Sequence, residues 1–152
     1  MHTDTQATPH VETVDTSFLE SLMGYNTRRA ALSIVELFMQ KMAVYDLRIV
    51  DFSVLSLIGH NPGITSRQLC SALNILPPNL VGIIVGLDKR ALITRLPHPH
   101  DGRATGLHLA PEGSELLRRA ESTAADLELE ATSRLSVAER KTLIRLLQKI
   151  YR

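Results

Sequence analysis

Apolar residues recur at helical spacing in the first part of the chain, after a polar start. Residues 1–16 are rich in Thr, His and Asp and have no periodic apolar positions, so we expect a disordered tail. From Ser17 to about Tyr45 no proline interrupts the chain. The apolar positions there predict one long helix: Leu22, Leu32, Val35, Phe38, Met39 and Met42.

Two shorter helices follow, each with a recognisable start or stop. The first is predicted over about Ile49–Gly59 and ends at the turn sequence Asn61-Pro62-Gly63. The second begins at Thr65, which forms a capping box with Gln68 three residues later, and runs to Leu73.

A tight corner then leads into a third helix of this group. Asn74 tolerates the left-handed backbone that such a corner requires. Pro77-Pro78 suits a first helical turn, where the missing N–H groups do no harm, and the helix continues to about Arg90.

Short apolar alternation marks both sides of a loop in the stretch Leu96–Leu109. The loop contains Pro, His, Asp, Gly and Arg, which predicts two small strands joined by an exposed hairpin with Arg103 near its tip. A long helix is predicted over about 111–133. A second capping box, Ser136–Glu139, begins a final helix that reaches the C-terminus.

Helices followed by a two-stranded hairpin with a basic tip form the organisation of a winged helix-turn-helix. The expected fold class is therefore mainly α with a small β-hairpin wing. Such a domain places one helix in the major groove of double-stranded DNA and the hairpin tip against the minor groove.

The composition fits about one domain of helical protein. The chain has 152 residues, 4% aromatic residues and no Trp. It lacks a run of about 18 apolar residues, and its N-terminus does not have the order of a signal peptide, so we expect no membrane segment. Cys70 is the only cysteine, which excludes an intrachain disulfide and suits a cytoplasmic location.

The net charge of +1 is small for a nucleic-acid-binding protein, but the charge is unevenly distributed. Residues 1–27 hold four acidic and no basic residues, so the rest of the chain carries +5. Residues 47–109 contain six basic and three acidic residues. We expect a modest positive field and salt-sensitive binding.

These segments resemble the MarR family of bacterial transcriptional regulators. The resemblance is carried by Ile64–Leu69, Asp88–Ile93, the hairpin sequence Asp101-x-Arg103 and Leu109–Gly113, and it covers about residues 18–151. It implies a homodimer, a pseudo-palindromic DNA operator and a small aromatic or phenolic effector that relieves a repressor. It implies no cofactor.

The resemblance also implies a division of the chain into functional parts. Residues 17–46 form a dimerisation helix, 47–109 a winged helix-turn-helix DNA-binding lobe, and 110–152 the C-terminal dimerisation helices.

Arg103 is the first residue that the resemblance assigns to DNA. A narrow A·T-rich minor groove attracts such a guanidinium, and we expect Asp101 to pair with it bidentately and fix its direction. The alternative is a solvated hairpin pair that contributes less than about 1 kcal/mol. The chain departs from the usual family pattern at His98, where an acidic residue is common, and at Gly102, where a basic residue is common.

The helix from Pro77 should bury Leu80, Ile84 and Leu87 and leave an unusually apolar face for DNA. Asn79 has an amide suited to a bidentate contact with adenine. Pro78 and Val81 suit thymine methyl groups, Gly82 permits a close backbone approach, and Pro77 and Val85 lie on the same side. The alternative is that this helix recognises little sequence itself, and that the wing and DNA shape supply specificity.

Further contacts are predicted at the start of the preceding helix. Thr65, Ser66 and Arg67 suit DNA phosphates, because a helix N-terminus with hydroxyl groups favours an anion. Arg90 and Arg95 are either additional phosphate contacts or members of surface ion pairs.

Tyr25, Arg28, Arg48 and Asp51 are the candidate ligand-binding residues, near the junction between the dimerisation helices and the DNA-binding lobe. An arginine can hold a carboxylate, and a tyrosine can stack on a ring. Ordinary interface or surface roles are the alternative for each of the four.

Other chemistry has weaker support. Cys70 lacks a close basic neighbour, so an inert thiol is favoured over a redox sensor. The sequence His98-Pro99-His100-Asp101 lacks the spacing of a helical metal site, and we expect no metal.

Two other function classes remain alternatives. The apolar helix from Pro77 could dock a protein instead of DNA, although the Asp101/Arg103 hairpin argues against this. An enzyme is disfavoured, because the sequence shows no nucleophile–base pair, Gly-rich phosphate loop or metal set.

Overall fold

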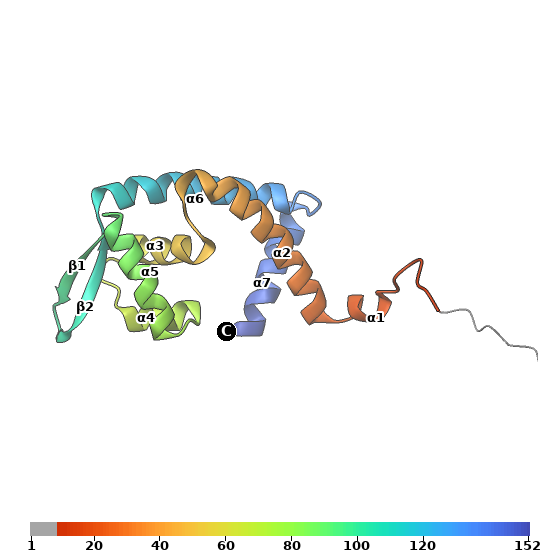
Figure 1. Ribbon diagram of the computed structural model, residues 1–152, viewed down its shortest axis with the longest axis horizontal. Helices are drawn as coiled ribbons and strands as arrows, with labels where there is room; N and C mark the ends of the chain where they lie inside the picture. The colour runs from red at the N-terminus through yellow and green to blue at the C-terminus, as the bar shows by residue number, and fades with distance from the viewer. Residues whose placement is uncertain (1–8) are drawn as a thin grey trace, which may run out of the picture. The chain divides into compact units, whose positions relative to one another are not determined.

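The computed structural model describes residues 9–152, so the first eight residues of the predicted tail lie outside the described part. Residues 9–16 form no helix or strand. Helices and one hairpin make up the rest (Figure 1). In chain order they are α1 (Ser17–Glu20), α2 (Met23–Met42), the 3₁₀ turn η1 (Ala43–Tyr45), α3 (Ile49–His60), α4 (Ser66–Leu73), α5 (Pro77–Lys89), β1 (Ile93–His98), β2 (Asp101–Leu109), α6 (Pro111–Ala131) and α7 (Val137–Tyr151).

The continuous helix expected from Ser17 to about Tyr45 is wrong in detail. It is interrupted between α1 and α2, and its last turn is the 3₁₀ turn η1. At the interruption, Ser21 Oγ donates to a backbone carbonyl three residues earlier over 2.6 Å. Asn26 Nδ2 donates to the carbonyls of Glu20 and Leu22, each over 2.8 Å. These short polar side chains occupy carbonyl groups that helical backbone bonds would otherwise use.

The other helices agree with the pattern-based predictions, and their caps are formed as expected. Thr65 Oγ1 accepts from the backbone N–H of Gln68 over 3.3 Å, and Gln68 Oε1 accepts from the N–H of Thr65 over 3.0 Å. Ser136 and Glu139 form the same arrangement before α7. The N–H of Ser136 bonds to the Glu139 carboxylate and lowers its pKa.

The chain divides into two compact units between Ser33 and Ile34, and α3, α4, α5 and the hairpin all belong to the second. Their shared core is formed by fully buried aliphatic side chains, each worth about 2 kcal/mol relative to exposure. It therefore holds α4, α5 and the hairpin on a common frame. Its largest members in these elements are Val54, Leu55, Ile58, Leu69, Leu80 and Leu107.

Strands β1 and β2 pair antiparallel, with Ile93 opposite Leu109 and Arg95 opposite Leu107. The base of the hairpin also pairs with the loop before α4, because the Leu107 carbonyl accepts from the N–H of Gly63 over 2.8 Å. At Gly106 a Cβ would lie only 3.0 Å from the Gly63 carbonyl oxygen. This glycine therefore allows the hairpin to approach the loop.

The last two helices differ in how they pack within the chain. Helix α6 begins where Gly113 meets the Leu92 carbonyl so closely that no side chain fits. It contributes Leu117, Ala120 and Leu127 to the core. Helix α7, in contrast, contains no buried residue. Within residues 9–152 no single helix is long and apolar enough to cross a membrane; only α4 and α5 together, bent by 115°, reach that length and composition.

Candidate nucleic-acid interface

A helix-turn-helix corner sets the direction of α5. Asn74 follows α4 with φ of 50° and ψ of 49°, the left-handed conformation predicted for it. The corner turns the chain by 115° between the two helices. Helix α5 then starts with two prolines in its first turn, as expected.

Helix α5 has one buried and one exposed face. Leu80, Ile84 and Leu87 are buried, which confirms the predicted helical phase, and Ile83 joins them. Val81 is 61% exposed and Val85 40% exposed. A Cβ built on Gly82 or Gly86 meets no atom within 4 Å, so this face is open. The other residues exposed on it are Pro77, Pro78 and Asn79.

The hairpin tip presents Arg103 to solvent, but its link to Asp101 differs from the prediction. Asp101 Oδ1 accepts a hydrogen bond from the backbone N–H of Arg103 over 3.0 Å. The expected bidentate pair with the guanidinium is not formed. A backbone donor two residues away is a nearer partner than the end of a long, mobile side chain. Asp101 therefore shapes the loop, and the Arg103 side chain stays available.

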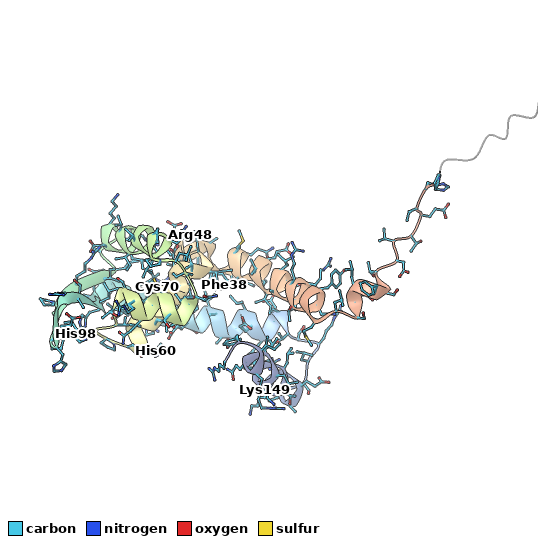
Figure 2. All side chains as sticks on the ribbon, turned by 90° about the horizontal axis from the view of Figure 1, so that it is seen from below. Phe38, Arg48, His60, Cys70, His98 and Lys149 are labelled. Atoms are coloured by element: carbon cyan, nitrogen blue, oxygen red, sulfur yellow. The ribbon has the colours of Figure 1, made fainter. Side chains whose placement is uncertain are left out.

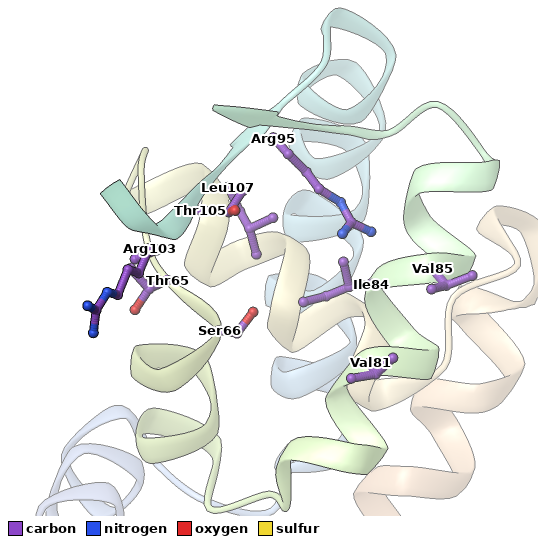
Figure 3. Close-up of a pocket in the computed structure, with 10 residues that line it drawn as sticks. Thr65, Ser66, Val81, Ile84, Val85, Arg95, Arg103, Thr105 and Leu107 are labelled. Atoms are coloured by element: carbon purple, nitrogen blue, oxygen red, sulfur yellow. The ribbon is translucent and has the colours of Figure 1, made fainter. Parts of the chain in front are cut away.

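A cleft of about 350 Å³ lies between the hairpin, the start of α4 and α5 (Figure 3). Thr65 and Ser66 line it from α4, and Val81 and Val85 from α5. Figure 3 shows Arg95 pointing from β1 toward α5, whereas the Arg103 guanidinium points away from that helix. Hydroxyl, methyl and cationic groups thus share one surface.

A second groove of about 460 Å³ adjoins the first. It brings Thr65 and Arg67 of α4 together with His98, Asp101 and Arg103 of the hairpin. The structure therefore gathers predicted contacts from two distant parts of the sequence. Its two guanidinium groups favour an anion, and a DNA phosphate supplies one.

Arg48 and Asp51, predicted ligand-binding residues, bind each other at the start of α3. Asp51 is 9% exposed. Its Oδ2 accepts from Arg48 Nε over 2.9 Å and from the Arg48 backbone N–H over 3.1 Å, while Oδ1 accepts from Nη2 over 2.9 Å. This hydrogen bonding raises the pKa of Arg48. Asp51 therefore caps the N-terminus of α3, and Arg48 lines an adjoining groove.

The other two ligand candidates lie in the first unit. Tyr25 is half-buried and Arg28 is exposed, both on the first turns of α2.

The residues considered for redox or metal chemistry are Cys70 and the two histidines near the hairpin tip. Cys70 is half-buried on α4, and His98 lies on the hairpin (Figure 2). The Nδ1 atom of His98 accepts from the backbone N–H of His100 over 3.2 Å. Within residues 9–152 no group of three or more His, Cys, Asp and Glu side chains has the arrangement to hold a metal ion.

Sequence reasoning missed the contacts that join the 3₁₀ turn η1 and helix α3 to α6. Tyr45 Oη lies 2.8 Å from Thr123 Oγ1 of α6. His60 Nε2 and Ser56 Oγ lie 2.7 Å and 2.8 Å from the same oxygen, Glu121 Oε1. These pairs are 61 to 78 residues apart, and no local motif indicates them.

An exposed helix after a tight corner, flanked by a cationic hairpin, defines a winged helix-turn-helix protein of the DNA-binding class. The sequence comparisons agree. A profile of the MarR family matches residues 45–104. The chain is also 35% identical over 101 residues to a Thauera aromatica protein assigned to transcriptional regulation of the hcr operon. That match covers 66% of this chain and 61% of the relative, so it spans less than two thirds of the relative's length.

Two solved structures resemble the whole fold. The transcriptional repressor CouR, bound to a 23-mer DNA duplex, is 33% identical with a TM-score of 0.87, covering 93% of this chain and 100% of that one. BpsR of Bordetella bronchiseptica, whose DNA binding is regulated by 6-hydroxynicotinic acid, is 25% identical with a TM-score of 0.79, covering 86% and 94%. The chain belongs to the MarR family of transcriptional regulators.

Proposed function

We propose that the protein is a dimeric, sequence-specific DNA-binding repressor that a small aromatic or phenolic ligand releases from its operator. The observation that carries the proposal is the shared surface of α5, the α4 N-terminus and the Arg103 hairpin. In this arrangement α5 enters the major groove, and Arg103 enters the adjacent minor groove.

The DNA contacts divide into two kinds. Thr65, Ser66 and Arg67 bind phosphates and set the register of the protein on the duplex. Asn79 and the apolar side chains of α5 contact base edges in the major groove.

Dimerisation is supported by the exposure of apolar side chains on α7. Within residues 9–152 no residue of this helix is buried, although it carries an apolar stripe. A second copy would cover that stripe, because monomers rarely leave such a surface in water. We assign residues 17–46 and 110–152 to dimerisation and 47–109 to DNA binding. The stripe includes Leu143 (42% exposed), Leu146 (46%) and Ile150 (64%).

Ligand response is supported by an apolar groove of about 580 Å³ at the end of α2 and the start of α3. Arg48 lines it together with Met39, Leu47 and Ile49. The Arg48 N–H groups that do not bond to Asp51 would donate to a carboxylate or phenolate. The size suits an aromatic acid. BpsR, similar in fold, responds to 6-hydroxynicotinic acid, which is a ligand of that type.

Fluorescence anisotropy with the DNA upstream of the protein's own gene tests the proposal. We expect tight binding that weakens steeply with salt, a weaker complex with a scrambled duplex, and release by one member of a panel of aromatic carboxylates and phenols. A complex that no compound releases would contradict the ligand response and leave DNA recognition in place.

A second candidate function is protein docking through α5, favoured by the exposure of Val81 and Val85. Absence of any salt-dependent, sequence-specific DNA complex in the same titration would favour this candidate over the first.

A further inference from the structure

Arg90, the residue that follows α5, hydrogen-bonds to the backbone of a different element. Its Nη1 donates to the Asp46 carbonyl over 2.6 Å, and its Nη2 donates to the Tyr45 carbonyl over 2.9 Å. The guanidinium therefore spans two consecutive carbonyl groups at the end of the 3₁₀ turn η1.

These two carbonyls are suitable acceptors for a cation. They lie at the C-terminal end of the continuous helical path through α2 and η1, where carbonyl groups lack helical partners and the helix dipole is negative. Asp46 has φ of 49° and ψ of 50°, so it ends the helix in the left-handed conformation. A planar guanidinium can bind both carbonyls at once, whereas a lysine ammonium cannot reproduce that geometry.

The turn that Arg90 holds is fixed on its other side by α6. Tyr45 Oη lies 2.8 Å from Thr123 Oγ1, and the Arg119 guanidinium carbon lies 5.4 Å from the centre of the Tyr45 ring. Arg90 therefore connects the end of the recognition helix to a turn that is itself anchored to the long helix α6.

We propose that Arg90 is a positioning residue for DNA recognition: it fixes the C-terminal end of α5 against the Tyr45–Asp46 turn, and it contacts no phosphate. The inference rests on the proposed DNA-binding function. It replaces the sequence-based alternatives for Arg90, a phosphate contact or a surface ion pair, because two backbone hydrogen bonds hold the guanidinium at the Tyr45–Asp46 turn.

The decisive variant is Arg90→Lys, which keeps the positive charge but cannot donate to both the Tyr45 and the Asp46 carbonyl in the same geometry. We expect its affinity for the specific operator to fall about tenfold, as for loss of a charge-assisted hydrogen bond. Its affinity for a scrambled duplex and the slope of log affinity against log salt should stay at the wild-type values, since no phosphate contact is lost.

Two further variants separate positioning from charge. Lys89→Ala removes a neighbouring exposed charge and should leave the ratio of specific to nonspecific affinity unchanged. Arg90→Ala should lower that ratio at least as much as Arg90→Lys. If Arg90→Lys binds the operator like wild type while Arg90→Ala loses about one unit of salt slope, Arg90 is a phosphate contact and the inference is overturned.

Hydrogen exchange of the free protein supplies a readout that needs no DNA. We expect faster exchange in the last turn of α5 and at Asp46 in Arg90→Lys, with the core of α3 unchanged. Unchanged exchange at both places would overturn the inference even if operator binding were impaired. A wild-type protein that binds no duplex specifically would instead refute the proposed function, and the exchange result would still decide whether Arg90 holds α5.

Discussion

Asp101 accepts from the Arg103 backbone N–H at the hairpin tip, and within residues 9–152 the Arg103 guanidinium forms no ion pair. A free guanidinium on a short, well-held loop can enter a narrow minor groove without first breaking an ion pair. The Asp101 contact contributes by ordering the loop in advance of binding. Under the proposed function, Arg103 would contact the DNA and Asp101 would set the geometry of the loop.

Arg103→Ala should therefore weaken operator binding by about 1–3 kcal/mol at constant salt. The loss should be greatest on operators with an A·T-rich flank, where the minor groove is narrow. Anisotropy titrations on paired A·T-rich and G·C-rich flanks measure both effects. Arg134→Ala, an exposed arginine before α7, serves as the matched control. Equal losses for the two variants would contradict the wing contact.

The exposed valines of α5 predict recognition through thymine methyl groups. Replacing dT by dU removes one methyl group from the major groove, worth about 0.8 kcal/mol if it is buried against Val81. We expect this penalty in the wild type and a smaller one in Val81→Ala, so that the two changes are not additive. Val44→Ala, 74% exposed on η1, is the control. Equal dU penalties in all three proteins would exclude Val81 from base recognition.

Several residues could be placed from sequence because their partners lie within one turn. The Thr65–Gln68 and Ser136–Glu139 boxes and the left-handed Asn74 depend only on local chemistry. Arg90 could not be placed, because its acceptor is a backbone carbonyl 44 residues earlier, and every residue has one. The Asp101–Arg103 ion pair was mispredicted because a local backbone donor competes with the side chain.

At the scale of elements, the predicted periods located α3 to α7 correctly but not the interruption after α1. Apolar spacing reports which face of a helix is buried, and it is insensitive to a break as short as the two residues between α1 and α2. Ser21 and Asn26 are the residues that could have indicated the break, because their side chains can donate to nearby backbone carbonyls. The hairpin begins at Ile93, before the stretch that showed clear alternation, because pairing with Leu109 extends it.

Helix α7 should be required for dimerisation, since no residue of its apolar stripe is buried within residues 9–152. A chain truncated at Ser136 is expected to be monomeric in sedimentation velocity at micromolar concentration, whereas the full chain is expected to be dimeric. The winged lobe should still unfold cooperatively, because its core draws on α3, α4, α5, β2 and α6. A truncated chain that stays dimeric would contradict this assignment.

At the scale of the whole molecule, the charge distribution and the fold both favour DNA binding by α5 and the hairpin. The chain carries a net charge of only +1, yet residues 1–27 hold four acidic and no basic residues. Arg67, Arg95 and Arg103 line the clefts beside α5 and the hairpin. A dimer would double this local field and present two recognition helices. The fold is similar over 93% of the chain to that of a repressor bound to a DNA duplex.

The most direct test of this account is hydroxyl-radical footprinting of the wild-type protein and Arg103→Ala on the DNA upstream of its gene. We predict two symmetric protected half-sites whose centres lie about one helical turn apart, as a two-fold symmetric dimer requires. The minor-groove protections that flank each half-site should be lost in Arg103→Ala. A single unsymmetrical footprint, or flanking protections that the variant retains, would contradict a dimer that binds DNA through α5 and the Arg103 hairpin.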